Sequence, residues 1–371
     1  MEVFPAIDPI PLPAPVWVFK ALHAVTLSLH FAAVQCTVGG LILATWWYLR
    51  GRPGYAPERM NASGVIIHRL PIIMAYVINL GVPPLLFAQA LYGRALYTSS
   101  ILMGIWWLSV VFLVMAAYFI LYQMAKRADT GRAYHWLSMI AIVLLLKVGY
   151  LYSANMTLML RPEVWPEMYR QNPLGFQLPK GDPTIMPRWL YMMIGSLGVS
   201  GAMVMLLGMK RHIPENSASF MRRRGGRLLG IFALVQIPLA WRVYAAQPEA
   251  VRAALRSNVF YLLCGGLLVL SALAVAVLGF LAAQQEHRRS WGWCGLCVSA
   301  VFVNLLLMTV YRDGIRDVTL KLHGFDVWQS PVNTNWTVVA VFLLLFVVMV
   351  AVMGWMVAVA ARAKGVDEQY A

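Results

Sequence analysis

The residues of this chain that are best suited to chemistry lie in its first long apolar run, 17–50. This run contains the polar side chains of His23, His30 and Gln35. His23 and His30 are seven residues apart, so in a helix they share one face, about 10 Å apart along the axis. Polar groups at membrane depth are costly and face a partner, a cavity or a cofactor. Because imidazole changes charge near neutral pH, we expect His30 or His23 to accept a proton from a substrate and Gln35 to add a polar contact.

Three further polar side chains, Lys147, Arg242 and Asn79, interrupt other apolar runs. A buried cation without a carboxylate needs another acceptor, such as a backbone carbonyl, a quinone oxygen, a haem propionate or a neighbouring subunit. We expect Lys147 and Arg242 to stabilise negative charge on a quinone oxygen and Asn79 to add a polar contact. Lys20 and Arg188 lie close enough to span ends for their charges to reach the membrane interface. None of the 15 Asp and Glu falls within the core of an expected span, which argues against proton-coupled or sodium-coupled transport.

A haem b group is the main alternative cofactor. It requires two axial ligands, usually His, from facing positions. The other histidines all lie at or beyond the expected membrane surfaces: His68, His135, His212, His287 and His323. His23 and His30 therefore have no histidine partner at their own depth, so only a His/Met or single-His haem through His30 or His23 stays open. The cysteines predict no metal site, because Cys294 and Cys297 lack further ligands nearby.

The composition sets the class of protein that positions these residues. Of the 371 residues, 60% are hydrophobic and only 12% are charged, which is typical of a polytopic membrane protein. An α-helix needs about 20 apolar residues to cross a bilayer. Runs of about this length predict an all-α fold with about nine transmembrane helices: 17–50, 65–92, 99–123, 135–152, 189–209, 228–244, 259–283, 293–311 and 336–360.

The distribution of charge predicts the orientation of these helices. The formal net charge of +15 would suggest a nucleic-acid partner for a soluble protein. Here more than half of the 30 Lys and Arg lie in alternate loops, which is the pattern of the positive-inside rule, so no nucleic-acid partner is expected. The pattern predicts a multi-pass membrane protein in contact with lipid, with its N-terminus outside and its C-terminus in the cytoplasm.

Polar stretches divide the chain into membrane and outer segments. Residues 1–16 carry five prolines and predict an extended extracytoplasmic arm. Residues 153–187 predict an interfacial cap, and the apolar periodicity within 312–335 predicts an interfacial helix in a second outer segment. The expected segments are therefore 1–16, transmembrane helices 1–4 in 17–152, the cap 153–187, transmembrane helices 5–8 in 188–311, 312–335, and the ninth helix with a cytoplasmic tail in 336–371.

Two sequence features bear on how the helices are arranged. Residues 81–84 (GVPP) lack two backbone donors, so they should kink or break the second helix. Matching residue types at one constant offset align 29–40 with 190–201. This alignment allows a parallel four-plus-four repeat of helices with the ninth helix left over.

Two motifs carry a resemblance to known proteins. The run 79–93 (NLGVPPLLFAQALYG) continues to 96–103 (LYTSSILM), and the first helix contains LHFAAVQCTVGG at 29–40. With these motifs the chain resembles little-characterised bacterial polytopic proteins encoded in respiratory gene clusters beside multihaem c-type cytochromes, most clearly over residues 25–120. Its four-plus-four arrangement is also similar to the haem-free, quinol-interacting membrane subunits of the NrfD-like (polysulfide-reductase) kind. These resemblances imply a bacterial inner-membrane subunit that uses menaquinone or ubiquinone and has an extracytoplasmic multihaem cytochrome c, or another redox subunit, as partner.

The sequence thus predicts an integral membrane subunit of a respiratory electron-transfer complex that binds quinol near the outer face. It would couple quinol to extracytoplasmic c-type cytochromes within a quinol:cytochrome c oxidoreductase. The redox centres are expected on partner proteins, because this chain has neither a c-type haem motif nor a set of four-Cys clusters. A b-type haem subunit, an anion transporter that uses Lys147 and Arg242, and a purely structural membrane anchor remain as alternatives.

Overall fold

A computed structural model describes residue 4 and residues 11–51, 56–285 and 290–362. The expected arm over 5–10, the expected tail over 363–371 and His287 lie outside these described residues. Within them the chain is helical, and the β pairing is confined to one isolated bridge between Leu12 and Val332.

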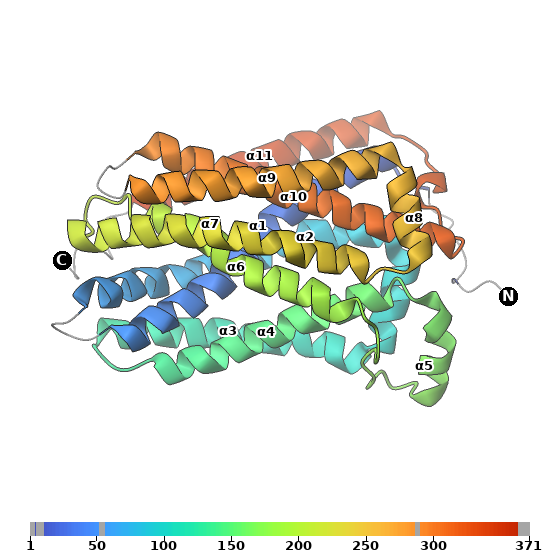
Figure 1. The fold of residues 1–371 in the computed structure, drawn as a ribbon. Coiled ribbons are helices and arrows are strands. Elements are labelled where there is room, and N and C mark those ends of the chain that lie inside the picture. Colours follow the sequence, from blue (N-terminus) through green and yellow to red (C-terminus); the bar gives the residue numbers. More distant parts are fainter. Residues whose placement is uncertain (1–3, 5–10, 52–55, 286–289, 363–371) are drawn as a thin grey trace.

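Nine helices in the described part of the chain are long and apolar enough to cross a membrane, which confirms the predicted all-α polytopic class. They lie along a common direction and form one elongated bundle (Figure 1). The nine are α1 (Val16–Arg50), α2 (Pro57–Leu102), α3 (Gly104–Asp129), α4 (His135–Leu158), α6 (Ile185–Leu207), α7 (Glu215–Ala245), α9 (Val259–Gln284), α10 (Trp291–Leu322) and α11 (Trp336–Arg362).

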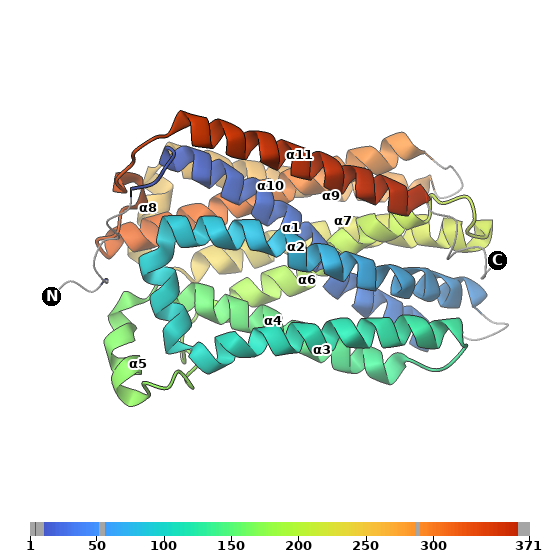
Figure 2. The same cartoon turned by 180° about the vertical axis from the view of Figure 1, so that it is seen from behind.

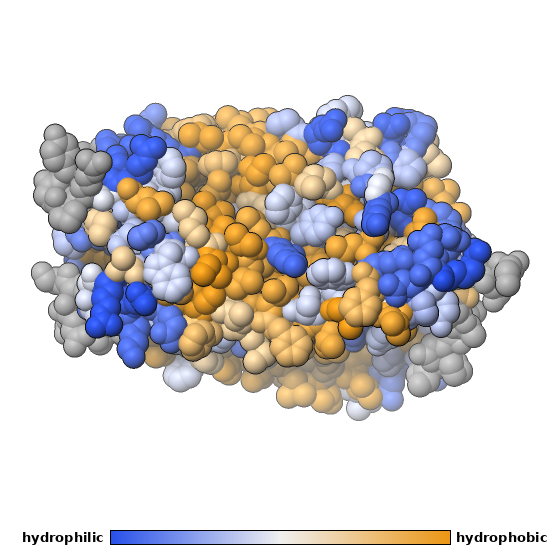
Figure 3. Space-filling model, turned by 90° about the horizontal axis from the view of Figure 1, so that it is seen from below, coloured by the Kyte–Doolittle hydropathy of each residue, from blue (hydrophilic) through white to orange (hydrophobic). Residues whose placement is uncertain are grey.

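The bundle has two distinct ends. The short helices α5 (Trp165–Gln171) and α8 (Glu249–Ser257) lie at the end where α1 begins, which we call the N-terminal end (Figure 1). The 3-10 turns η1 (Pro162–Val164) and η2 (Val327–Gln329) follow helices that finish at this same end. The opposite end, which we call the basic end, carries the Arg-rich start of α7. Figure 3 shows an apolar band across one face of the molecule, with hydrophilic residues gathered toward both ends.

The last turns of α10 correct the sequence interpretation of 312–335. We expected a span ending at 311 and a separate interfacial helix, but α10 continues unbroken to Leu322. Asp313 and Asp317 consequently lie in the last turns of a helix that is long enough to span a membrane, beyond the end expected at 311. The helix tolerates their charges because they pair with Lys20 inside the protein rather than facing lipid. A separate short helix at this end is α8, which buries the apolar side chains of Val251 and Leu255.

The bend of α2 lies elsewhere than predicted. Pro83 and Pro84 are both inside the helix, and the backbone leaves helical geometry only at Tyr92, with φ −130° and ψ 20°. Figure 2 shows the last turns of α2 turning sharply away from the rest of the helix. α1 packs along this stretch, and two of its histidines contact the Pro84 and Val77 backbone oxygens of α2. Tyr92 bends the chain because its side chain is completely buried in contacts with other helices.

The helices α1 and α6 form the closest contact in the middle of the bundle. A side chain on Gly39 would overlap the backbone oxygen of Ser196, so only glycine fits at this crossing. Ser200 Oγ donates a hydrogen bond to the Gln35 backbone oxygen over 2.9 Å. The two segments that the sequence aligned, 29–40 and 190–201, therefore lie against each other. The parallel repeat itself stays a prediction.

Candidate functional site

A buried group of charged side chains lies at the N-terminal end between α1, α2 and α10. We call it the charged cluster; it consists of Lys20, Tyr92, Asp313, Arg316 and Asp317. Lys20 Nζ lies 2.8 Å from Asp313 Oδ2 and 2.6 Å from Asp317 Oδ2, and it also donates to the Tyr92 hydroxyl. Lys20 is only 9% exposed, so the expectation that its charge would reach the membrane interface is wrong. Its amine is instead held by the two carboxylates.

The Tyr92 hydroxyl stands between the two carboxylates. It lies 2.7 Å from Asp317 Oδ1 and 2.9 Å from Asp313 Oδ1. A hydroxyl has one proton to donate, so only one of the two contacts can be a full hydrogen bond at a time. Arg316 Nη1 lies 3.2 Å from Asp313 Oδ1, and its guanidinium lies 4.7 Å from the centre of the Tyr92 ring. Two cations and two carboxylates thus neutralise one another around a shared proton.

Trp328, in η2, separates the charged cluster from the surface. Its Nε1 donates to Asp317 Oδ2 over 3.1 Å, while its side chain is 53% exposed. Asp317 therefore lies one side chain below the surface of the protein. Asp326 fixes this turn by accepting from the Trp328 backbone N–H and by pairing with Lys321 at 2.9 Å. Burial alone would raise the pKa of the Asp326 carboxyl, but these two partners outweigh it and leave the pKa below its usual range.

His23 and His30 both contact α2 from the same face of α1. His23 Nδ1 lies 3.0 Å from the Pro84 oxygen, and His30 Nδ1 lies 3.1 Å from the Val77 oxygen. The two carbonyl groups are seven residues apart on α2, which matches the spacing of the histidines on α1. Because a carbonyl oxygen only accepts, Nδ1 carries the proton in both rings.

The second ring nitrogen distinguishes the two histidines. His23 Nε2 lies 3.3 Å from Arg316 Nη1, which can only donate, so His23 is a neutral acceptor beside a fixed cation. No hydrogen bond to His30 Nε2 is found among the described residues. Gly81 lies against this ring, since a Cβ there would be 3.0 Å from His30 Cε1. Both histidines of the first helix therefore contact the motif at 79–93. His23 contacts the Pro84 backbone oxygen, and the His30 ring lies against Gly81, which has no side chain.

The other predicted site residues lie apart from the charged cluster. Asn79, Lys147 and Arg242 are exposed on the outside of the bundle. Asn79 Nδ2 donates to its own helix at the Ala75 oxygen over 2.8 Å, and Lys147 Nζ lies 5.1 Å from the Trp106 ring. In the described part of the chain none of these three contacts a predicted histidine.

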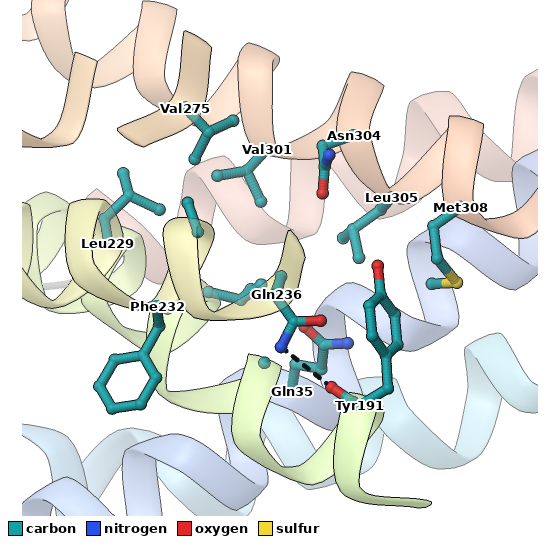
Figure 4. Close-up of a pocket in the computed structure, with 14 residues that line it drawn as sticks. Gln35, Tyr191, Leu229, Phe232, Gln236, Val275, Val301, Asn304, Leu305 and Met308 are labelled. Atoms are coloured by element: carbon teal, nitrogen blue, oxygen red, sulfur yellow. Dashed lines mark hydrogen bonds between the residues drawn. The ribbon is translucent and has the colours of Figure 1, made fainter. Parts of the chain in front are cut away.

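Gln35 lines a small, mostly apolar cavity between helices, which three side-chain amides, its own included, border. Figure 4 shows the amides of Gln35 and Gln236 on one side of it and that of Asn304 on the other, with Tyr191 beside them. Gln236 Nε2 donates to the Tyr191 backbone oxygen over 3.1 Å, and Asn304 Nδ2 donates to Ser271 Oγ over 2.8 Å. The cavity has a volume of about 40 Å³. Since one water needs about 10–15 Å³, the cavity suits a few waters and is too small for a quinone or haem ring.

Sequence reasoning missed Tyr92, Asp313, Arg316 and Asp317. The signal for the last three was the spacing of charges in 312–317, which repeats at three and four residues, as one face of a continuing helix requires. No Pro separates this segment from the span before it. Tyr92 carries no comparable signal in the sequence. No group of three His, Cys, Asp or Glu that could hold a metal ion is found in the residues searched, which are those the structure describes.

The fold and the site define an integral α-helical membrane protein with a neutralised ionic network beneath one end of its bundle. No protein-family model matches the chain, and no curated protein matches its sequence. Among solved structures, the chain is similar to the bd oxidase from Geobacillus thermodenitrificans, with a TM-score of 0.69. The match covers 96% of this chain and 100% of that chain at 12% sequence identity. At that identity, the likeness shows a shared fold.

Proposed function

We propose that this chain is an integral subunit of a respiratory electron-transfer complex that binds quinol near the outer face of the bacterial inner membrane. The charged cluster is the observation that carries the proposal, because its shared proton lies one side chain below the surface. The fold supports it, since the similar solved chain belongs to an oxidase. The positive-inside rule puts the basic end in the cytoplasm, so the N-terminal end and the charged cluster face outward.

The chemistry is the two-electron oxidation of a quinol. Both O–H bonds of the quinol break, two electrons pass to two oxidised haems of an extracytoplasmic c-type cytochrome, and two protons leave toward the outside. The paired carboxylates Asp313 and Asp317 would take up these protons, and their contacts with Lys20 and Arg316 hold them in place. Release past Trp328 to the outer surface would complete each turnover.

The sequence-predicted residues take different parts in this proposal. His23, as a neutral acceptor beside Arg316, positions that guanidinium. Gln35 and its cavity would hold water in the middle of the bundle. The exposed side chains of Lys147, Arg242 and Asn79 are available to lipid or to a partner subunit.

A b-type haem on His30 is the second candidate. A ligating histidine donates its other ring N–H to a fixed acceptor, and His30 Nδ1 does so to the Val77 oxygen. A haem bound there would supply one-electron transfer. The small cavity beside Gln35 does not border His30. Loss of a haem b absorbance band in His30→Ala would favour this candidate over the quinol proposal.

The test compares two aspartates of the N-terminal end in the native complex. Asp317→Asn should lower quinol-dependent reduction of the cytochrome by roughly tenfold to hundredfold, since hydrogen bonds to charged groups contribute about 1.5–3 kcal/mol. Asp326→Asn is the matched control and should stay within about twofold, because Asp326 pairs with the exposed Lys321. Tyr92→Phe removes the shared proton while keeping the ring, so it tests the network if Asp317→Asn fails to assemble. Normal turnover in an assembled Asp317→Asn or Tyr92→Phe complex would contradict the proposal and favour a structural anchor.

A further inference from the structure

A groove lies inside the bend of α2, where the last turns of that helix meet the start of α3. It has a volume of about 340 Å³. We call it the elbow groove; its lining includes Gln89, Leu96, Tyr97, Ser100, Gly104 and Trp107. Tyr97 is 54% exposed, so the groove opens sideways on the outside of the bundle rather than into its core.

Two local features of α2 produce the elbow groove. Tyr92 leaves helical geometry because its side chain reaches into the charged cluster, and this bend folds the two arms of α2 toward each other. Gly93 follows the bend directly and lies four residues before Tyr97, which places these two residues on the same face of the second arm. It has no side chain to fill the bend, and a Cβ there would meet only the Tyr97 ring, at 3.4 Å.

In the described part of the chain, two polar side chains of the elbow groove have no protein hydrogen-bond partner. Among the described residues no hydrogen bond is found for the half-buried side-chain amide of Gln89 or for the Tyr97 hydroxyl. Ser100 Oγ accepts from Asn155 Nδ2 over 3.0 Å and keeps its own proton to donate. The side-chain amide of Gln89 and the hydroxyl groups of Tyr97 and Ser100 are therefore available to a ligand that carries hydrogen-bonding atoms.

The shape and surroundings of the groove favour a flat head group attached to an apolar tail. The Trp107 ring forms a flat aromatic wall. It packs edge-on against the Tyr152 ring, with 4.9 Å between the two ring centres. A volume of this order falls in the range of small-molecule sites, about 300–1,000 Å³. The cap covers the α2–α3 junction beside the groove, since the Gly175 oxygen accepts from Ile105 N over 3.2 Å and the Phe176 oxygen from Trp106 Nε1 over 2.8 Å.

We infer that the elbow groove binds the head of a membrane quinone, with its prenyl tail in the lipid. Gln89 and Tyr97 hydrogen-bond the head, Trp107 stacks on its ring, and the bend residue Tyr92 joins the same helix segment to the proton-accepting carboxylates. This inference rests on the proposed function and gives the quinol site a location on α2 and α3, apart from the predicted histidines. A phospholipid that fills the groove with its acyl chains is the competing occupant.

The experiment uses the native complex, a photoreactive azido-quinone and a pair of glycine variants on α2. Gly93→Leu adds a side chain against the ring of Tyr97, a residue that lines the elbow groove, at a position where a Cβ would have no other neighbour within 4 Å. Gly64→Leu is the matched control, because a Cβ at Gly64 has no neighbour within 4 Å and this residue lies near the opposite end of α2. We expect the azido-quinone to label a peptide within 85–107, and Gly93→Leu to reduce that labelling and quinol turnover at least tenfold. Gly64→Leu should change neither, and Gln89→Leu should raise the KM for quinol about tenfold with a smaller effect on kcat.

The outcomes separate this inference from the proposed function. Labelling elsewhere in the chain that Gly93→Leu leaves unchanged would overturn the groove assignment and leave quinol oxidation by the complex intact. Phospholipid recovered in the groove, together with normal turnover in assembled Gly93→Leu, would also overturn it. A wild-type complex with no quinone labelling and no quinol turnover would overturn the proposed function as well. Thermal unfolding and subunit composition show that each variant has assembled.

Discussion

Replacing Lys20 with methionine removes the cation at the centre of the charged cluster. Met keeps most of the apolar length of the lysine side chain, so the packing change is small. Asp313 keeps its contact with Arg316, at 3.2 Å, whereas Asp317 keeps only the Tyr92 hydroxyl and Trp328 Nε1. One carboxylate, 8% exposed, is then left without a cation.

Breaking a buried ion pair on one side costs about 3–5 kcal/mol, because the remaining charge stays buried. For a protein of this size we expect Lys20→Met to lower the Tm of the purified protein in detergent by roughly 5–10 °C. Lys321→Met is the control, since Lys321 is 68% exposed in its pair with Asp326. An exposed pair contributes about 0–1 kcal/mol, so the control should shift the Tm little.

A compensating substitution sharpens this test. Lys20→Met combined with Asp317→Asn removes the uncompensated charge and should recover at least half of the lost stability. Equal Tm values for Lys20→Met and Lys321→Met would refute the reasoning that the cluster is a buried, mutually neutralised network. So would a double variant that is less stable than Lys20→Met alone.

Three further predictions follow from close contacts of the helices. Gly39→Ala should abolish stable folding, because its Cβ would overlap the Ser196 backbone oxygen. The loss would be seen as the absence of monodisperse protein on size-exclusion chromatography. Gly64→Ala is the control and should behave as wild type, because the space around Gly64 is open. Gly81→Ala should lower the Tm by a few degrees, since its Cβ would press on the His30 ring at 3.0 Å, and an unchanged Tm would mean that the ring has room to move. Trp328→Phe removes the indole donor to Asp317 and should cost about 1.5–3 kcal/mol in thermal unfolding, while Trp336→Phe, at an exposed position, should cost much less.

The amino-acid sequence by itself determined the nine spans and the shared face of the two histidines. Both are local properties: a span needs only enough consecutive apolar residues, and two residues seven apart in a helix meet the same neighbour.

The helix ends were less well predicted where charges begin, because a local pattern takes Asp313, Arg316 and Asp317 as the end of an apolar run. Only the tertiary structure brings Asp313 and Asp317 to Lys20, nearly three hundred residues earlier, and pairing makes their charges compatible with a spanning helix. The bend at Tyr92 also depends on tertiary structure, because contacts with α1 and α10 set it. The exposed position of Lys147 likewise depends on which face of α4 the neighbouring helices cover. Such pairings depend on how helices far apart in the sequence pack, and no local pattern of residues encodes that packing.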